Sequence, residues 1–132
     1  MSSRTDVIRA ETIALIDAEN VRRSRWPNLP SDELLSRSLD WANREGVRAW
    51  LVCDGQTPSG AVGEQDLGAG HKAVGTSGET ADDWIIRQAR DFRSNQQPYW
   101  LITSDRLLRD LAGGEAARIL GGGSFLRKLD IG

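Results

Sequence analysis

The stretch "TIALIDAENV" (residues 12–21) passes directly from an apolar run into an acid and an amide. A continuous run of aliphatic residues is typical of a strand that is buried on both faces, as in a parallel sheet. Asp17 follows this run at once, and Asn20 lies three residues further on. The sequence therefore predicts a central strand whose carboxyl end carries polar side chains.

Further apolar runs have the length of strands, and helical patterns lie between them. The predicted strands are 47–53, 99–103, 117–120 and a less apolar one at 71–75. The predicted helices are 31–46, 80–94 and 104–114. Ser31 and Thr80 stand at the expected N-caps of the first two helices, and Gly46 is expected to end the first. Strands that alternate with helices are typical of an α/β fold with a parallel sheet and right-handed crossovers.

One segment, residues 55–70, interrupts this alternation. It contains five glycines and a proline and shows no regular periodicity. A loop of this length inside a small domain is usually functional or disordered, so we expect a flexible glycine-rich loop there. The chain has 132 residues, which suits one hydrophobic core, and we expect a single domain over residues 1–132.

The composition is that of a soluble globular protein, with 39% hydrophobic and 27% charged residues. The formal net charge of −2 excludes a global positive field that would attract nucleic acid. Cys53 is the only cysteine, so no internal disulfide can form and a reducing compartment is expected. No signal-peptide core or membrane-length apolar run is present in the sequence. We expect a cytoplasmic protein with no membrane partner.

Carboxylates recur where the strongest predicted strands end. Asp17, Asp54 and Asp105 each follow an apolar run, and the helix at 80–94 begins with Asp82 and Asp83. The carboxyl ends of parallel strands share one edge of the sheet, where ligands bind. Each acid taken alone has a structural explanation as a helix cap or a strand end. Together they would repel one another unless a cation compensates, and all-oxygen donor sets suit Mg²⁺ or Mn²⁺.

A zinc site is excluded by the residue counts, because the chain has one cysteine and one histidine. The histidine, His71, stands in the glycine-rich region, and we expect a solvated side chain rather than a ligand. A receiver-type phosphoacceptor domain is also disfavoured, since no lysine follows the last predicted strand at 117–120.

Four short motifs occur in a fixed order along the chain: "LIDAENV" (15–21), "VCDG" (52–55), "GETADDWI" (78–85) and "LITSDRLL" (101–108). In this order and spacing they resemble the NYN domains, and among them the YacP-like branch of the PIN-like nuclease superfamily. The resemblance extends from Ile13 to about Phe125. It departs from the usual pattern in one place, because Ala18 and Glu19 stand where that branch usually has Gly-Tyr.

The resemblance implies a PIN-like three-layer sandwich with a central, parallel, five-stranded sheet in the order 3-2-1-4-5, flanked by helices. It also implies a metal-dependent ribonuclease that uses Mg²⁺ or Mn²⁺. By motif matching, the residues expected in catalysis are Asp17, Asn20, Asp82, Asp83 and Asp105. Those expected to hold metal are Asp17, Asp54, Asp82 and Asp105.

Basic residues follow the first motif closely, in "VRRSRWPN" (21–28). Arg22, Arg23 and Arg25 are within reach of the same sheet edge and are expected to bind RNA phosphates, although a solvated surface is the alternative. Ser104, in the fourth motif, is likewise expected to contact RNA. For Trp26, beside Pro27, we expect packing of the loop against the core, with stacking on an unpaired base as the alternative.

The resulting hypothesis is hydrolysis of RNA, in single-stranded form, at a carboxylate-bound metal site. Two alternatives stay open at this point. One is a PIN-like module without catalytic activity that binds RNA or a partner protein. The other is the toxin of a toxin–antitoxin pair.

Overall fold

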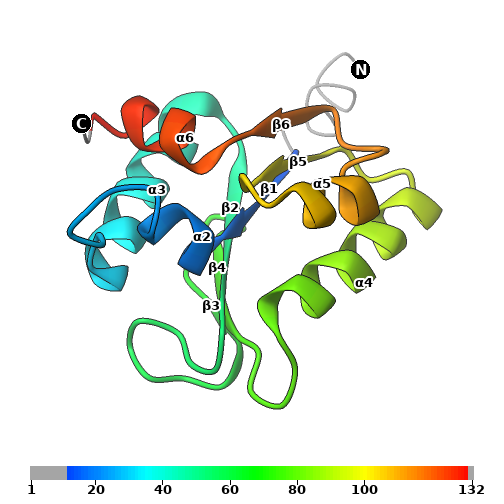
Figure 1. Cartoon of the computed structure of the whole chain (residues 1–132). Helices are drawn as coiled ribbons and strands as arrows, with labels where there is room; N and C mark the ends of the chain where they lie inside the picture. Colours follow the sequence, from blue (N-terminus) through cyan, green and yellow to red (C-terminus); the bar gives the residue numbers. More distant parts are fainter. Residues whose placement is uncertain (1–11, 131–132) are drawn as a thin grey trace.

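The computed structural model describes residues 12–130, which build one six-stranded sheet with helices on both faces (Figure 1). The strands are β1 (Ile13–Asp17), β2 (Arg48–Cys53), β3 (Gly63–Asp66), β4 (Lys72–Gly75), β5 (Tyr99–Ile102) and β6 (Arg118–Leu120). The helices are α2 (Ala18–Arg22), α3 (Ser31–Glu45), α4 (Ala81–Ser94), α5 (Arg106–Ala112) and α6 (Gly122–Lys128).

The sheet order is β3-β4-β2-β1-β5-β6, and every neighbouring pair is parallel except β3 and β4. The five parallel strands, β4-β2-β1-β5-β6, follow the predicted order 3-2-1-4-5. The α/β class and the parallel sheet are therefore confirmed. Strand β1 is central, between β2 and β5, as its continuous apolar run predicts.

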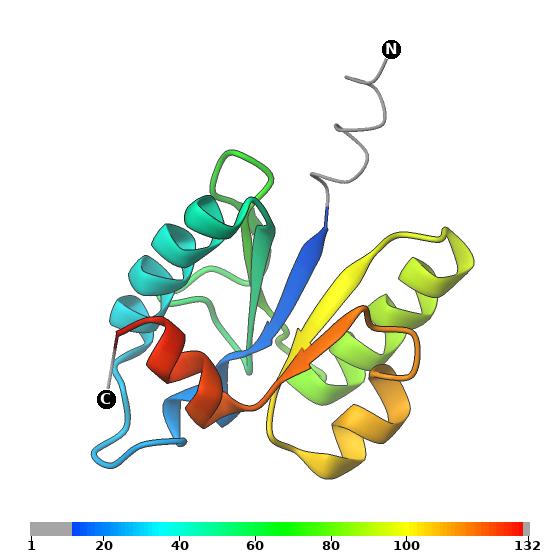
Figure 2. The ribbon, with the colours of Figure 1, turned by 90° about the horizontal axis from the view of Figure 1, so that it is seen from above.

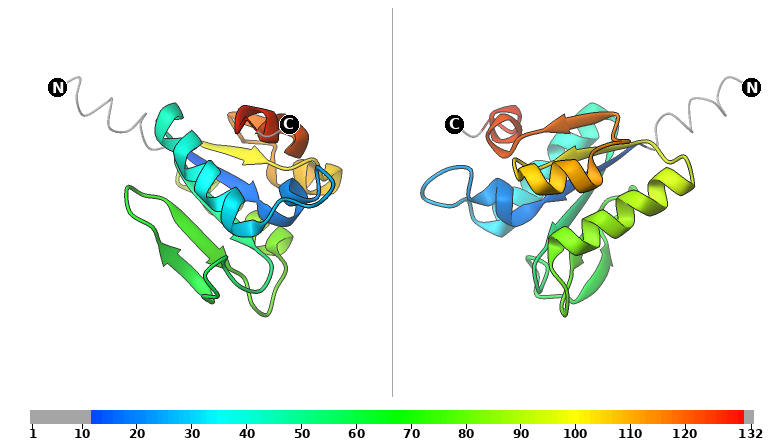
Figure 3. Two further views of the ribbon diagram at one scale, coloured as in Figure 1. Left: turned by 90° about the vertical axis from the view of Figure 1, so that its left-hand side faces the viewer. Right: turned by 45° about the vertical axis from the view of Figure 1, so that its right-hand side comes forward.

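The sixth strand, β3, corrects the sequence-based expectation for residues 55–70. It forms an antiparallel hairpin with β4 at the sheet edge (Figure 3). Its sequence "GEQD" is polar, and its residues alternate between half-buried and exposed, so no apolar signal marked it as a strand. The expectation of a segment without regular structure is wrong for these four residues. Flexibility of the remainder stays a prediction.

Two hydrophobic clusters lie between the sheet and the helices that flank its two faces. Figure 2 shows these helices on either side of the sheet. Alternate residues of β1 point to opposite faces, with Ile16 in one cluster and Leu15 in the other. Helices α2, α3 and α6 cover the first cluster, whose centre is Trp41, packed edge-on against Phe125 at 4.9 Å between ring centroids. Helices α4 and α5 cover the second cluster. The arrangement is a three-layer sandwich.

Helix ends follow the predicted chemistry in part. The Thr80 hydroxyl caps α4 by accepting a hydrogen bond from the Asp83 N–H, and Gly46 ends α3 in the left-handed conformation. The expected cap Ser31 is instead the first helical residue of α3. The helix predicted from Ser104 begins later, because the Asp105 side chain supplies the cap of α5. The short helices α2 and α6 were not predicted.

His71 is buried rather than solvated, which corrects the expectation for this side chain. Its Nδ1 accepts a hydrogen bond from the Ala49 N–H at 3.0 Å, so Nε2 carries the proton and donates to Asn43 Oδ1. Burial and the nearby Arg48 charge lower the pKa of the imidazole. His71 therefore joins the β3–β4 hairpin to β2 and α3 as a neutral ring.

Within residues 12–130, none of the helices is both long enough and apolar enough to cross a bilayer.

Candidate functional site

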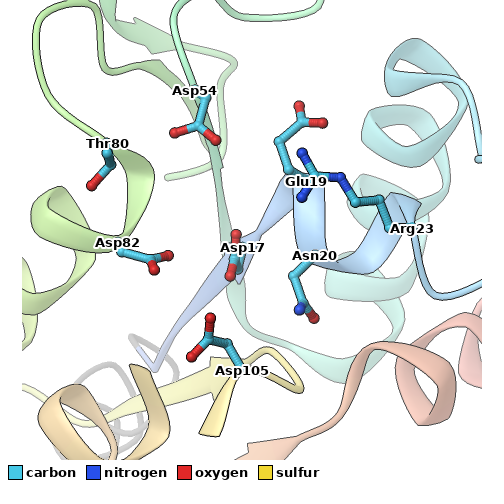
Figure 4. Close-up of a pocket in the computed structure, with 8 residues that line it drawn as sticks. All are labelled: Asp17, Glu19, Asn20, Arg23, Asp54, Thr80, Asp82 and Asp105. Carbon is cyan, nitrogen blue, oxygen red and sulfur yellow. The ribbon is translucent and has the colours of Figure 1, made fainter. Parts of the chain in front are cut away.

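A pocket of about 300 Å³ opens at the carboxyl edge of the sheet, where the chain leaves β1 in one direction and β5 in the other (Figure 4). Such a topological switch point is the usual ligand site of an open parallel sheet. The lining residues are Asp17, Glu19, Asn20, Arg23, Asp54, Thr80, Asp82 and Asp105. Of the five acids expected at this edge, Asp17, Asp54, Asp82 and Asp105 line the pocket, and Asp83 does not.

Asp17 lies at the centre of the pocket and is 5% exposed. Desolvation raises the pKa of its carboxyl group to about 6, although the hydrogen bond from the Thr103 hydroxyl, at 2.9 Å, acts in the opposite direction. The negative charges of Asp82 and Asp54 raise the pKa further. The fold thus holds a carboxylate where its ionised form is disfavoured unless positive charge is nearby.

Thr103 was not identified from the sequence, and it connects two of the acids. Its hydroxyl donates to Asp17 Oδ2 and accepts from the Asp105 N–H at 3.1 Å, and the residue is fully buried. A hydroxyl at the end of the otherwise apolar run "YWLIT" was the only sequence signal. Thr103 therefore orients Asp17 relative to the turn that carries Asp105.

Replacing Thr103 by valine is expected to lower the free energy of unfolding by about 1–3 kcal/mol, because two buried polar groups lose their partner. Thr103→Ser keeps the hydroxyl and is expected to stay much closer to the wild type. Urea unfolding of both variants at pH 7 in EDTA measures the difference. Equal stability of the valine variant and the wild type would show that this bridge contributes nothing.

Asp82 and Asp83 are adjacent in sequence but differ in position. Asp82 lines the pocket and is half-buried, whereas Asp83 is exposed and is not among the lining residues. The pKa of Asp82 is raised mainly by burial, and to a smaller extent by the negative charges of Asp105, Asp54 and Asp83. Asp82 thus lies with the other acids in the pocket. Asp83, also in the first turn of α4, lies outside the pocket.

Asp54 and Asp105 each use one carboxylate oxygen to cap a helix. Asp54 Oδ1 accepts from the Ala81 N–H at 2.7 Å, and Asp105 Oδ1 accepts from the Leu108 N–H at 3.0 Å. These bonds fix both carboxylates at helix N-termini. Figure 4 shows both turned toward Asp17. A carboxylate has two oxygens, so capping by one leaves the other to serve a ligand.

Asn20 and Ser104 tie the pocket walls together. The Asn20 amide oxygen accepts from the Ser104 N–H at 2.8 Å, and the Ser104 hydroxyl accepts from the Gly122 N–H at 2.7 Å. The start of α2, the turn after β5 and the start of α6 are thereby linked. These contacts give both residues a structural part beside the catalytic and RNA-binding parts predicted for them.

The three arginines expected to bind RNA have different surroundings. The Arg22 guanidinium is engaged within the protein, since it bonds to the Leu29 carbonyl and to Glu19, each at 2.7 Å. Arg23 is exposed and lines the pocket beside Glu19 (Figure 4). Arg25 is half-buried, and its Nε donates to the Pro27 carbonyl at 3.2 Å. Arg23 is therefore the one best placed for a phosphate near the carboxylates.

The expectation that Trp26 packs on the core is wrong, because its side chain is 87% exposed. Leu29 anchors this loop instead, with no exposed surface. Leu29 thus packs in the hydrophobic core, the role that the sequence analysis assigned to Trp26.

The donor set of the pocket fits a hydrated Mg²⁺ or Mn²⁺. Five carboxylates line it, those of Glu19 and four aspartates, and burial and mutual repulsion raise the pKa of Asp17 and Asp82. Among residues 12–130, no three His, Cys, Asp or Glu side chains stand close enough together to ligate one ion. Mg²⁺ retains several waters and usually takes only one or two protein carboxylates directly. The spacing of these carboxylates would suit an ion that keeps most of its hydration shell.

Comparisons with known proteins identify the family and the fold of the chain. A family model described as the YacP-like NYN domain matches residues 14–131. The structure is similar to that of Rae1 (YacP) from Bacillus subtilis, with a TM-score of 0.65 and 22% identity over 89% of this chain and 73% of that one. For the W164L mutant of the same protein the TM-score is 0.67, with 21% identity over 90% of this chain and 75% of that one. These identities support a shared fold. No curated protein matches the chain.

Proposed function

Because the chain belongs to the YacP-like NYN domain family, a family of PIN-like nucleases, we propose that it is a metal-dependent ribonuclease. The observation that supports this most is the convergence of Asp17, Asp54, Asp82 and Asp105 on one pocket at the switch point of the sheet. Like charges that converge on a buried carboxylate such as Asp17 cost stability, and a divalent cation offsets that cost.

The proposed cation is Mg²⁺ or Mn²⁺, which when bound would polarise a phosphodiester and lower the pKa of a coordinated water. Asp17, Asp54, Asp82 and Asp105 are the residues that would hold it. Thr103 orients Asp17, and Asn20 fixes the turn before Asp105 through the Ser104 N–H. Arg23, at the rim, would contact a phosphate of the RNA. Asp83, outside the pocket, adds to the negative charge that raises the pKa of Asp82.

The cleavage assay tests this proposal directly. The full chain should hydrolyse single-stranded RNA in Mn²⁺ or Mg²⁺, and EDTA should stop the reaction. Asp105→Asn should be inactive, whereas replacement of Asp110, an exposed acid on the helix that Asp105 caps, by Asn should leave cleavage normal. RNA binding without cleavage under all these conditions would favour the alternative of a non-catalytic binding module.

Metal binding is also expected to stabilise the fold. At a metal concentration about a hundredfold above the dissociation constant, the free energy of unfolding should rise by about 2.7 kcal/mol through mass action. Thermal melts in EDTA and in a series of Mn²⁺ concentrations measure this, with Asp110→Asn as the control. Midpoints that do not change with Mn²⁺ would argue against a metal site in this pocket.

A further inference from the structure

Trp26 stands on the loop between α2 and α3, which projects from the body of the molecule (Figure 3). With 87% exposure it differs from the other tryptophans, of which Trp41 and Trp84 are buried and Trp50 and Trp100 half-buried. A large aromatic ring normally gains free energy from burial. This one contributes almost nothing to the core.

The loop does not need Trp26 for its own structure. At its base, the Arg22 carbonyl accepts from the Leu29 N–H at 3.2 Å, and Arg22 Nε donates to the Leu29 carbonyl at 2.7 Å. The Leu29 side chain is fully buried, and the Ser24 hydroxyl donates to the Asn20 carbonyl at 2.9 Å. These contacts hold the loop to α2, and thus to the pocket wall, with the indole left in solvent.

The position of Trp26 relative to the carboxylate pocket is set by the chain. Helix α2 begins directly after Asp17, and Arg23 at its end lines the pocket. Three residues of chain span at most about 11 Å between Cα atoms, so Trp26 lies within that distance of Arg23. A nucleic-acid strand with a phosphate at Arg23 would therefore pass within a few nucleotides of the loop that carries the indole.

We propose that Trp26 is a base-stacking residue of the substrate site, which selects RNA with an unpaired base beside the cleaved bond. This rests on the proposed ribonuclease function. A base inside a duplex has both faces covered by its neighbours, whereas an unpaired base offers a free face to an aromatic side chain. Arg23 and Arg25 supply positive charge on the same loop for the adjoining phosphates.

The surroundings of Trp26 favour a nucleic acid over a partner protein. Most residues beside it are charged or polar, with Arg23, Ser24 and Arg25 before it and Asn28 after Pro27. Protein-binding surfaces usually combine an aromatic anchor with a contiguous apolar area. The other exposed large hydrophobic residues within 12–130 lie elsewhere, on the segment after Gly60, on α5 and on β6. A lone aromatic ring among arginines matches the stacking platforms of single-strand binding proteins.

The test measures binding separately from cleavage. In the Asp105→Asn background with Mg²⁺, Trp26→Ala, Trp26→Phe and the control Leu111→Ala are titrated with short oligouridine and with an abasic strand of equal length. Leu111 is 56% exposed on α5, so its variant matches the loss of an exposed hydrophobic side chain. Trp26→Ala should bind oligouridine roughly tenfold or more weakly, and Trp26→Phe should restore most of the affinity. Abasic RNA should bind all variants equally.

Tryptophan fluorescence gives a second readout, because stacking should quench Trp26 on addition of oligouridine and not of the abasic strand. Equal binding of oligouridine by Trp26→Ala and by its parent would overturn the inference, even if the unmutated chain cleaves RNA. A protein would then be the better candidate for the partner of this loop. Equal weakening for both strands would also overturn it. Trp26-dependent binding in a chain that never cleaves would support the stacking role and refute the ribonuclease.

Discussion

Replacing Asp17 by asparagine is expected to abolish RNA cleavage and, without divalent metal, to make the protein more stable at pH 7. The carboxyl group is buried among other acids, and its pKa is raised from 3.8 to about 6. Ionising it in the folded protein therefore costs up to about 3 kcal/mol relative to the unfolded chain. Asparagine presents an oxygen to the Thr103 hydroxyl without the charge.

The pH dependence follows from the direction of this shift. Below about pH 4, Asp17 is protonated in both states and costs nothing. As the pH rises through 6, the unfolded chain loses its proton first, so the folded state becomes less stable by the full amount. The wild type should lose this stability between pH 4 and 6 in EDTA, and Asp17→Asn should not.

Urea unfolding from pH 4 to 8 measures this difference, with the exposed Asp110→Asn as the control. Excess Mn²⁺ should reverse the order at pH 7, because the wild type gains binding energy that the variant lacks. An Asp17→Asn protein that is less stable than the wild type in EDTA at pH 7 would contradict the electrostatic explanation. A variant that still cleaves RNA would remove Asp17 from the proposed site.

Asp82→Asn and Asp83→Asn are expected to differ greatly in activity. Asp82 lines the pocket, so its loss should lower the cleavage rate roughly 100-fold or more, as when a charge-stabilising group is removed from an active site. Asp83 is exposed in the first turn of α4. Its variant should cleave within about threefold of the wild type and lose only about 0.3–1 kcal/mol of helix-dipole stabilisation.

Cleavage rates in saturating Mn²⁺ and melts in EDTA are needed for both variants. In EDTA, Asp82→Asn should be as stable as the wild type or more stable, since burial and three neighbouring acids raise the pKa of the wild-type carboxyl group. An inactive Asp83→Asn protein with unchanged stability would show that both acids serve the reaction.

Much of the fold could be predicted from local pattern. The apolar run before Asp17 indicated a strand buried on both faces, and Thr80 as the expected N-cap indicated the start of α4. The edge strand β3 escaped notice because only half of its surface is covered and its residues are polar. Trp26 was assigned to the core because hydrophobicity is a property of the residue alone. Burial depends on the tertiary structure, and here Leu29, not Trp26, is the residue of the loop that is buried.

The sequence by itself determined the α/β class and the set of acids at the strand ends, because periodicity acts through short stretches of chain. The order of the parallel strands was implied by the resemblance of the four ordered motifs to the NYN domains. Only the tertiary structure decided which of two adjacent acids enters the pocket, and that Thr103 joins Asp17 to Asp105. It also decided that Arg22 is held within the loop while Arg23 reaches the rim. The physical reason is that hydrogen bonds and desolvation depend on the relative placement of β1, α4 and β5, which are distant in sequence and meet only when the sheet has formed.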